Sequence, residues 1–195
     1  MLAKFLMKPF GSFWDLKSSL QTEQSGAISK IKKAIYRMYL YENSADIAIS
    51  SYFESEPCMP HGERGVFISG ATKVGKNAII FQQVTIGSVT LPDSKGLGAP
   101  TIGDNCYIGA GAKIVGKVTI GDNVRIGANA VVYQDVPDNS VVVSGAQKTI
   151  TKKEPLINRY YTYEKDKDIW TYFQDGKWIK EENPALVSIL HGDSH

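Results

Sequence analysis

The sequence has few cysteines, little net charge and no long apolar run near its N-terminus. It has two cysteines and three histidines in 195 residues, and two isolated cysteines cannot form the disulfide framework of a small secreted domain. The formal net charge of +2 is far from the basic balance that is typical of nucleic-acid-binding domains. Lys4, Lys8 and Pro9 interrupt the apolar stretches at the N-terminus, so we expect neither a secretion signal nor a membrane span. These absences favour a cytoplasmic protein that does not bind nucleic acid.

The strongest pattern that is present is a six-residue period of aliphatic residues. Six residues fit neither a helix nor a single strand, but they fit a short strand and a corner, repeated as a parallel β-helix. Four residues after each aliphatic comes a small or β-branched residue, or a cysteine, suited to a narrow interior. The aliphatic positions are Ile68, Val74, Ile80, Ile86, Ile102, Ile108, Ile114, Ile120, Ile126 and Val132. Their companions are Thr72, Ala78, Val84, Thr90, Cys106, Ala112, Val118, Val124, Ala130 and Val136.

Glycines and a break give further detail of the repeat. We expect the glycines that follow six of the aliphatic residues to turn corners at backbone angles that a side chain would make costly. These are Gly75, Gly87, Gly103, Gly109, Gly121 and Gly127. The period is interrupted between Ile86 and Ile102, where loop-forming residues from Ser88 to Gly98 predict an extra loop. A last strand is expected at Val141 to Val143.

The segment before the repeats, residues 1–45, reads as a helical cap. A helical pattern runs from Gly26 to Glu42, and its predicted packing face contains Ile28, Ile31, Ile35 and Met38. The aromatic residues near the N-terminus are expected to pack on the first coil or on a neighbouring subunit. Because lysines lie among them, peripheral contact with a membrane surface is the alternative.

The segment after the repeats, residues 151–195, is rich in aromatic residues. Asp175 and Gly176 lie between alternating residues, which predicts a β-hairpin with Phe173 opposite Trp178. Packing is the first interpretation of these aromatics. A sugar-stacking platform made of Trp170, Tyr172 and Trp178 is the second.

From about Asp46 to Ile150 the chain resembles the hexapeptide-repeat acyltransferases, which fold as left-handed parallel β-helices. Four stretches carry the resemblance, and they look most like serine acetyltransferases and their relatives that O-acetylate bacterial surface sugars: residues 60–62, 65–68, 80–87 and 108–116. The resemblance implies an all-β fold over 46–150 with a left-handed winding. It also implies acetyl-CoA as co-substrate, no metal, and a homotrimer with active sites between subunits.

His61 is the candidate catalytic base. It is the one histidine outside the C-terminal stretch, and imidazole is suited to take a hydroxyl proton near neutral pH. The resembling families have a catalytic histidine just before the same repeat block. Asp46, fifteen residues earlier, matches the aspartate that pairs with it there, and nearly one turn of eighteen residues separates the two. Glu54 or Glu56 could supply the carboxylate instead.

The resemblance also implies a coenzyme groove between adjacent subunits. The small residues Ser88, Ala110 and Ala128 would line it, with Lys148 near the adenosine phosphates. We expect Ala110 and Ala128 to face outward and Ala112 and Ala130 inward.

The sequence alone does not identify the acceptor substrate. An Arg-His-Pro run of serine acetyltransferases corresponds here to Gly98, Ala99 and Pro100, and an aspartate before the catalytic histidine corresponds to Pro60. These departures favour a sugar hydroxyl of surface polysaccharide as the acceptor. L-Serine is the alternative, and an inactive trimeric scaffold is the third hypothesis.

Overall fold

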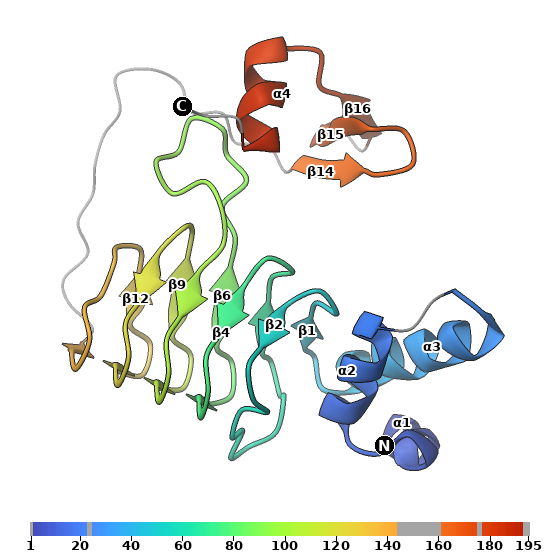
Figure 1. Ribbon diagram of the computed structural model, residues 1–195, viewed down its shortest axis with the longest axis vertical. Coiled ribbons are helices and arrows are strands. Elements are labelled where there is room, and N and C mark those ends of the chain that lie inside the picture. The colour runs from blue at the N-terminus through green and yellow to red at the C-terminus, as the bar shows by residue number, and fades with distance from the viewer. Residues whose placement is uncertain (1, 23–24, 144–160, 175–176, 193–195) are drawn as a thin grey trace.

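The computed structural model describes residues 2–22, 25–143, 161–174 and 177–192. Its centre is a three-sided prism of parallel sheets, in which each coil of the chain contributes one short strand to each face (Figure 1). The first face contains β1 (Asp46–Ile47), β3 (Phe67–Ile68), β6 (Thr85–Gly87), β9 (Lys113–Val115) and β12 (Val131–Val132). The second contains β2 (Tyr52–Phe53), β4 (Lys73–Val74), β7 (Thr101–Ile102) and β10 (Thr119–Ile120). The third contains β5 (Ile79–Ile80), β8 (Tyr107–Ile108), β11 (Arg125–Ile126) and β13 (Val141–Val142).

The interior of the prism is filled by the six-residue repeat, as the sequence predicts. Strands of successive coils pair in register, so that Ile68 lies beside Ile86 and Ile86 beside Ile114. None of the ten repeat aliphatics is more than 4% exposed. Their small or β-branched companions are also buried, except Thr90 and Val136. The repeat therefore builds a continuous core, since each coil buries its apolar side against its neighbours.

The glycines after the aliphatic residues have a different role from the one predicted. Gly75, Gly103 and Gly121 do not have a positive φ angle. A Cβ atom at Gly103 would instead lie 2.8 Å from the carbonyl carbon of Gly121, and closer still to the Asp122 carboxylate of the next coil. That carboxylate accepts a hydrogen bond from the Asp104 N–H at 2.7 Å. These glycines are therefore needed for close approach between coils, not for an unusual backbone angle.

Asparagines provide the left-handed backbone conformation at the corner between the second and third faces. The residues with positive φ at this corner are Asn77, Asn105, Asn123 and Asn139. Asparagine tolerates this conformation better than most residues do. The Asn77 side chain also donates to that of Asn105 at 3.0 Å, which links successive coils.

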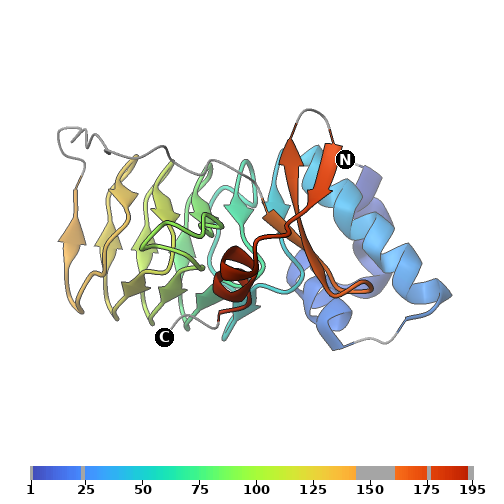
Figure 2. The same cartoon turned by 90° about the horizontal axis from the view of Figure 1, so that it is seen from above.

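Helices cover the N-terminal end of the prism (Figure 2). They are α1 (Leu2–Met7), the 3-10 turn η1 (Lys8–Phe10), α2 (Phe13–Thr22) and α3 (Ala27–Glu42). Phe13 stacks on Tyr36 at 4.9 Å, and Trp14 packs edge-on against Phe53 at 4.8 Å. None of the helices in the described ranges has the length and apolar content that a membrane span requires.

Polar side chains of α2 satisfy the open end of the first coil. The carbonyl oxygens of Ile49 and Ser51 have no preceding coil to bond with, and both accept from the Lys17 ammonium and the Gln21 amide. Lys17 is only 2% exposed, and this burial lowers its pKa to about 8.

Two expectations require correction. The helices at the N-terminal end were predicted, but the fold is all-β only within residues 46–143, because α4 (Pro184–His191), which the sequence did not predict, lies near the C-terminus. Ile28 and Ile31 do not pack but are 60% and 55% exposed, and the buried apolar residues of α3 are Ile35, Tyr36 and Leu40. Phe5 of α1 is 65% exposed and does not pack on the first coil, and its packing on a neighbouring subunit stays a prediction.

The C-terminal segment forms a small antiparallel sheet beside α4. Its strands are β14 (Tyr161–Glu164), β15 (Ile169–Gln174) and β16 (Lys177–Lys180). Phe173 pairs with Trp178 in the predicted register, while the turn residues 175–176 lie outside the described residues. Tyr161 and Thr171 are buried in this sheet, and the Tyr161 hydroxyl donates to Glu181 at 3.0 Å.

Candidate active site

His61 lies where the regular coil is interrupted. Strands β1 and β3 pair with an offset of 21 residues, Asp46 with Phe67, whereas β3 and β6 pair with an offset of 18. The bridge between Cys58 and Ile79 keeps the offset of 21. Three extra residues are therefore inserted between Cys58 and Phe67, and the corner loop that they enlarge carries His61.

This loop is one of several corners that lead from the third face to the first. Together they form an edge of the prism, which we call the His61 edge: residues 43–45, 59–66, 81–84, 109–112 and 127–130. Backbone hydrogen bonds of 2.9–3.0 Å tie each corner to the next: Gly65 N–H to Asn43, Gln83 N–H to Arg64, Gly111 N–H to Gln82, and Asn129 N–H to Ala110.

The His61 side chain is exposed and rests on a row of aromatic rings. Its ring centre lies 5.8 Å from that of Phe81, which lies 5.0 Å from that of Tyr107. The Arg125 guanidinium lies over Tyr107 at 5.9 Å. The row passes from coil to coil along the prism, so the imidazole lies at the head of a surface that runs toward the later coils.

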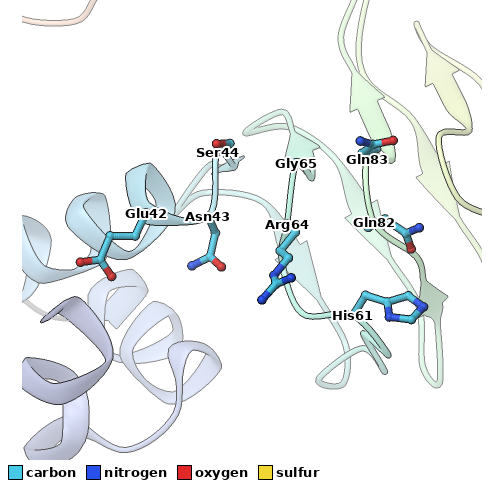
Figure 3. Close-up of a pocket in the computed structure, with 8 residues that line it drawn as sticks. All are labelled: Glu42, Asn43, Ser44, His61, Arg64, Gly65, Gln82 and Gln83. Atoms are coloured by element: carbon cyan, nitrogen blue, oxygen red, sulfur yellow. The ribbon is translucent and has the colours of Figure 1, made fainter. Parts of the chain in front are cut away.

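A pocket of about 700 Å³ opens beside His61. Its lining combines the end of α3, the inserted loop and the next corner: Glu42, Asn43, Ser44, His61, Arg64, Gly65, Gln82 and Gln83. Figure 3 shows the imidazole turned toward the later coils and the Arg64 side chain turned toward the helices. Within the described part of the chain, no carboxylate forms an ion pair with Arg64.

Buried contacts fix the loop that carries His61. Glu63 is only 7% exposed and accepts a hydrogen bond from the Tyr39 hydroxyl at 2.7 Å. Burial, together with this carboxylate, raises the pKa of Tyr39 above its usual range. The Gly62 N–H also donates to the Met59 carbonyl at 2.9 Å. The loop is therefore held by a turn around His61 and tied to α3 through Glu63.

Asp46 and His61 line different pockets. Asp46 is the first residue of β1 and lines a second pocket, of about 410 Å³, on the first face. Among the described residues, no hydrogen bond joins Asp46 to His61. The alternatives do not reach His61 either: Glu54 pairs with Lys76 at 3.0 Å, and Glu56 lines pockets near Trp14. The three-residue insertion makes the first coil longer than the even coil on which the pairing of Asp46 with His61 was predicted, and that pairing stays a prediction.

Two of the candidate coenzyme residues share an edge with His61. Ala110 is half-buried and Ala128 is exposed on the corners that follow Gln82 along the His61 edge. Ala112 and Ala130 are 0% exposed, which is the alternation that the repeat predicts.

The other two candidates lie elsewhere. Ser88 is exposed and lines the Asp46 pocket, at the start of the extra loop. Hydrogen bonds of 2.9 Å between Val89 and Gly98 close the base of this loop, which leaves the prism between the first and second faces and projects toward α4 (Figures 1 and 2). Lys148 lies outside the described residues.

Comparison with known proteins agrees with this architecture. A family model described as bacterial transferase hexapeptide (six repeats) matches residues 99–134. A serine acetyltransferase of Bacillus pumilus is 36% identical over 141 residues, which are 67% of this chain and 64% of that protein. The chain contains the bacterial transferase hexapeptide repeat over residues 99–134, and it is similar to serine acetyltransferases.

Two further serine acetyltransferases show the same similarity. A serine acetyltransferase of Helicobacter pylori is 45% identical over 92 residues, 47% of this chain and 52% of that protein. The crystal structure of Neisseria gonorrhoeae serine acetyltransferase in complex with serine has a TM-score of 0.57 and 25% identity, covering 70% of this chain and 53% of that one. The chain thus spans about half to two thirds of the length of these relatives.

Sequence reasoning missed three residues of the candidate site. Phe81 lies beneath the imidazole and Gln82 lies at the pocket wall. Both belong to the repeat motif, and the motif alone gives them no role in a site. Arg64 lies in the insertion, which has no periodic signal. The one available signal was the spacing of nine residues from Cys58 to Phe67, in place of six.

Proposed function

We propose that the protein is an acetyl-CoA-dependent O-acetyltransferase in which His61 is the general base and L-serine is the acceptor. The observation that carries this proposal is the position of His61, at a polar pocket and at the head of the edge that contains Ala110 and Ala128. The relatives named above are serine acetyltransferases, which supports L-serine better than the sugar acceptor that the sequence favoured. A sugar hydroxyl is the second candidate, because Gly98, Ala99, Pro100 and Pro60 depart from the serine acetyltransferase pattern.

His61 would act by accepting a proton. Acetyl-CoA supplies the thioester, and the acceptor hydroxyl must lose its proton as its oxygen attacks the thioester carbonyl. An imidazole with one unprotonated nitrogen can take this proton near neutral pH. The exposed position of His61 leaves it accessible to both substrates, and the anchored loop keeps it in place.

Arg64 is the residue that we assign to the acceptor carboxylate. It lines the pocket with His61, and its guanidinium can bind a carboxylate through two parallel hydrogen bonds. Replacing L-serine with L-serinamide removes the charge from the acceptor. We expect the KM of the native protein for serinamide to exceed that for serine at least tenfold, and Arg64→Gln to reduce this difference.

The coenzyme would lie along the His61 edge. Alanine side chains at 110 and 128 leave the backbone of the corners accessible to a long, narrow ligand. We propose a trimer with left-handed coils, in which this groove is completed by a neighbouring subunit, where Asp46 and Ser88 of the first face and the 88–98 loop are available. Lys148 as a phosphate contact, cytoplasmic location and peripheral membrane contact stay predictions.

Thiol release from acetyl-CoA tests the proposed function. Purified protein should release coenzyme A in the presence of L-serine, and His61→Ala should lower this rate roughly a hundredfold to ten-thousandfold. Release with a saccharide and not with serine would favour the second candidate. Absence of thioester cleavage with either acceptor would favour the scaffold, and full activity of the His61 variant would exclude His61 as the base.

A further inference from the structure

Gln82 has an unsatisfied polar atom at the wall of the His61 pocket. Its side-chain oxygen is buried, and within the described part of the chain it has no hydrogen-bond partner. Leaving a buried polar atom unpaired costs about 1–3 kcal/mol, and such atoms are rare in folded proteins. An unpaired atom beside a candidate catalytic group therefore requires an explanation.

The position of Gln82 suggests that explanation. Figure 3 shows the Gln82 side chain above the imidazole, with its oxygen on the His61 side. The ring is held on the neighbouring Phe81 at 5.8 Å but has no hydrogen bond of its own among the described residues. A donor without an acceptor and an acceptor without a donor thus line the same pocket.

The backbone of Gln82 is fixed more firmly than its side chain. The carbonyl of Gln82 accepts from the Gly111 N–H at 3.0 Å, and the adjacent Gln83 N–H donates to Arg64 at 3.0 Å. Gln82 is therefore held between the loop that carries His61 and the corner that carries Ala110. The side chains of Gln82 and His61 line the same pocket, and the exposed imidazole can rotate to direct its N–H toward the amide oxygen.

We propose that Gln82 is a positioning residue that accepts a hydrogen bond from one imidazole nitrogen of His61 and leaves the other nitrogen unprotonated toward the acceptor. This inference rests on the proposed function and assigns to a neutral amide the orienting role that the sequence assigned to Asp46. An amide fixes the tautomer without the strong increase in basicity that a carboxylate causes. The other side chains of the pocket that can carry charge are Glu42 and Arg64.

Two substitutions test this role in the full chain. Gln82→Met keeps the length of the side chain and removes the acceptor; kcat should fall about fivefold to tenfold, the effect of one neutral hydrogen bond, while the KM for acetyl-CoA stays within twofold. Gln82→Glu places a carboxylate beside the imidazole and stabilises its protonated form. The acidic limb of the kcat/KM profile should therefore move upward by about one pH unit.

Gln83→Glu is the matched control. It adds the same charge to the next residue of the corner, but Figure 3 shows this side chain on the far side of the corner from His61. We expect a clearly smaller shift of the acidic limb. Equal shifts from both variants would mean that charge acts at long range, and the proposed contact would be wrong.

Nuclear magnetic resonance of the imidazole nitrogens gives a readout that does not depend on activity. The chain has three histidines, so the His61 signal can be assigned from the spectrum of His61→Ala. One tautomer should dominate in the native protein and both should be populated in Gln82→Met. If the tautomer ratio and kcat are unchanged in Gln82→Met, the role of Gln82 is refuted; if His61→Ala is fully active, the proposed function fails instead. Should Gln82→Met not fold, Gln82→Glu still decides the question through the pH profile.

Discussion

Tryptophan substitutions at two positions, two residues apart, test the coenzyme groove and the packing of the core separately. Ala128→Trp and Ala130→Trp add equal bulk to the corner between β11 and β12. Ala128 is exposed and Ala130 is 0% exposed, so only the direction of the added side chain differs. The first change should affect the coenzyme and the second should affect stability.

The expected magnitudes follow from these two environments. Overpacking a buried site costs about 1–3 kcal/mol or more, and each kcal/mol lowers the Tm of a chain of this size by about 2–4 °C. Ala130→Trp should therefore lower the Tm by roughly 2–12 °C. An exposed substitution changes stability by about 0.5 kcal/mol or less, so the Tm of Ala128→Trp should stay within about 2 °C of the native value.

Coenzyme binding is the decisive measurement. An indole at 128 would cover the corner next to Ala110, and we expect the Kd for acetyl-CoA, measured by calorimetric titration, to rise at least tenfold, about 1.4 kcal/mol. Melting curves by circular dichroism provide the parallel measurement. If Ala128→Trp binds acetyl-CoA normally and is well folded, the groove does not pass this corner.

Three further predictions concern assembly and stability. Light scattering should show a trimer, and an active, stable monomer would contradict the proposed groove. Gly103→Ala should destabilise the protein by about 2–4 kcal/mol, because its Cβ would collide with the backbone of Gly121; Gly26→Ala, where the space is open, is the control in chemical denaturation. Lys17 binds its proton less tightly in the folded state, with a pKa of about 8, than in the unfolded state near 10.4. The free energy of unfolding should therefore increase as the pH rises from about 8 to 10. Lys17→Met should abolish this increase.

Much of the fold could be predicted because its interior repeats. Side chains such as Ile80 and Ile126 occupy equivalent interior positions in different coils. Once the register of one coil is known, the interior positions of the other coils follow. The glycines were correctly located but wrongly explained, because contact between Gly103 and the next coil cannot be read from one coil's sequence. The face of α3 was misread at Ile28 and Ile31, since periodicity gives the direction of an apolar stripe but not what it packs against.

The candidate site was harder to predict than the fold. The spacing from Asp46 to His61 was interpreted on an even coil of eighteen residues, but the first coil has 21, because three residues are inserted in the loop that carries His61. Gln82 could not be recognised from the sequence, because a glutamine at a corner has the same signal whether it faces solvent or a catalytic group.

The placement of the residues suggests why catalysis would need more than one chain. His61, Gln82, Ala110 and Ala128 share one edge, whereas Asp46, Ser88 and the 88–98 loop belong to the first face or to the opposite edge of that face. Within one prism, the first face lies between the His61 edge and the edge that carries Ser88 and the 88–98 loop. A rotational assembly in which the His61 edge of one subunit meets the first face of the next would join them once per interface. One imidazole nitrogen must stay unprotonated toward the acceptor, so Gln82 and Asp46 cannot both accept its N–H. If Gln82 is the partner, Asp46→Asn should leave the tautomer ratio of His61 unchanged.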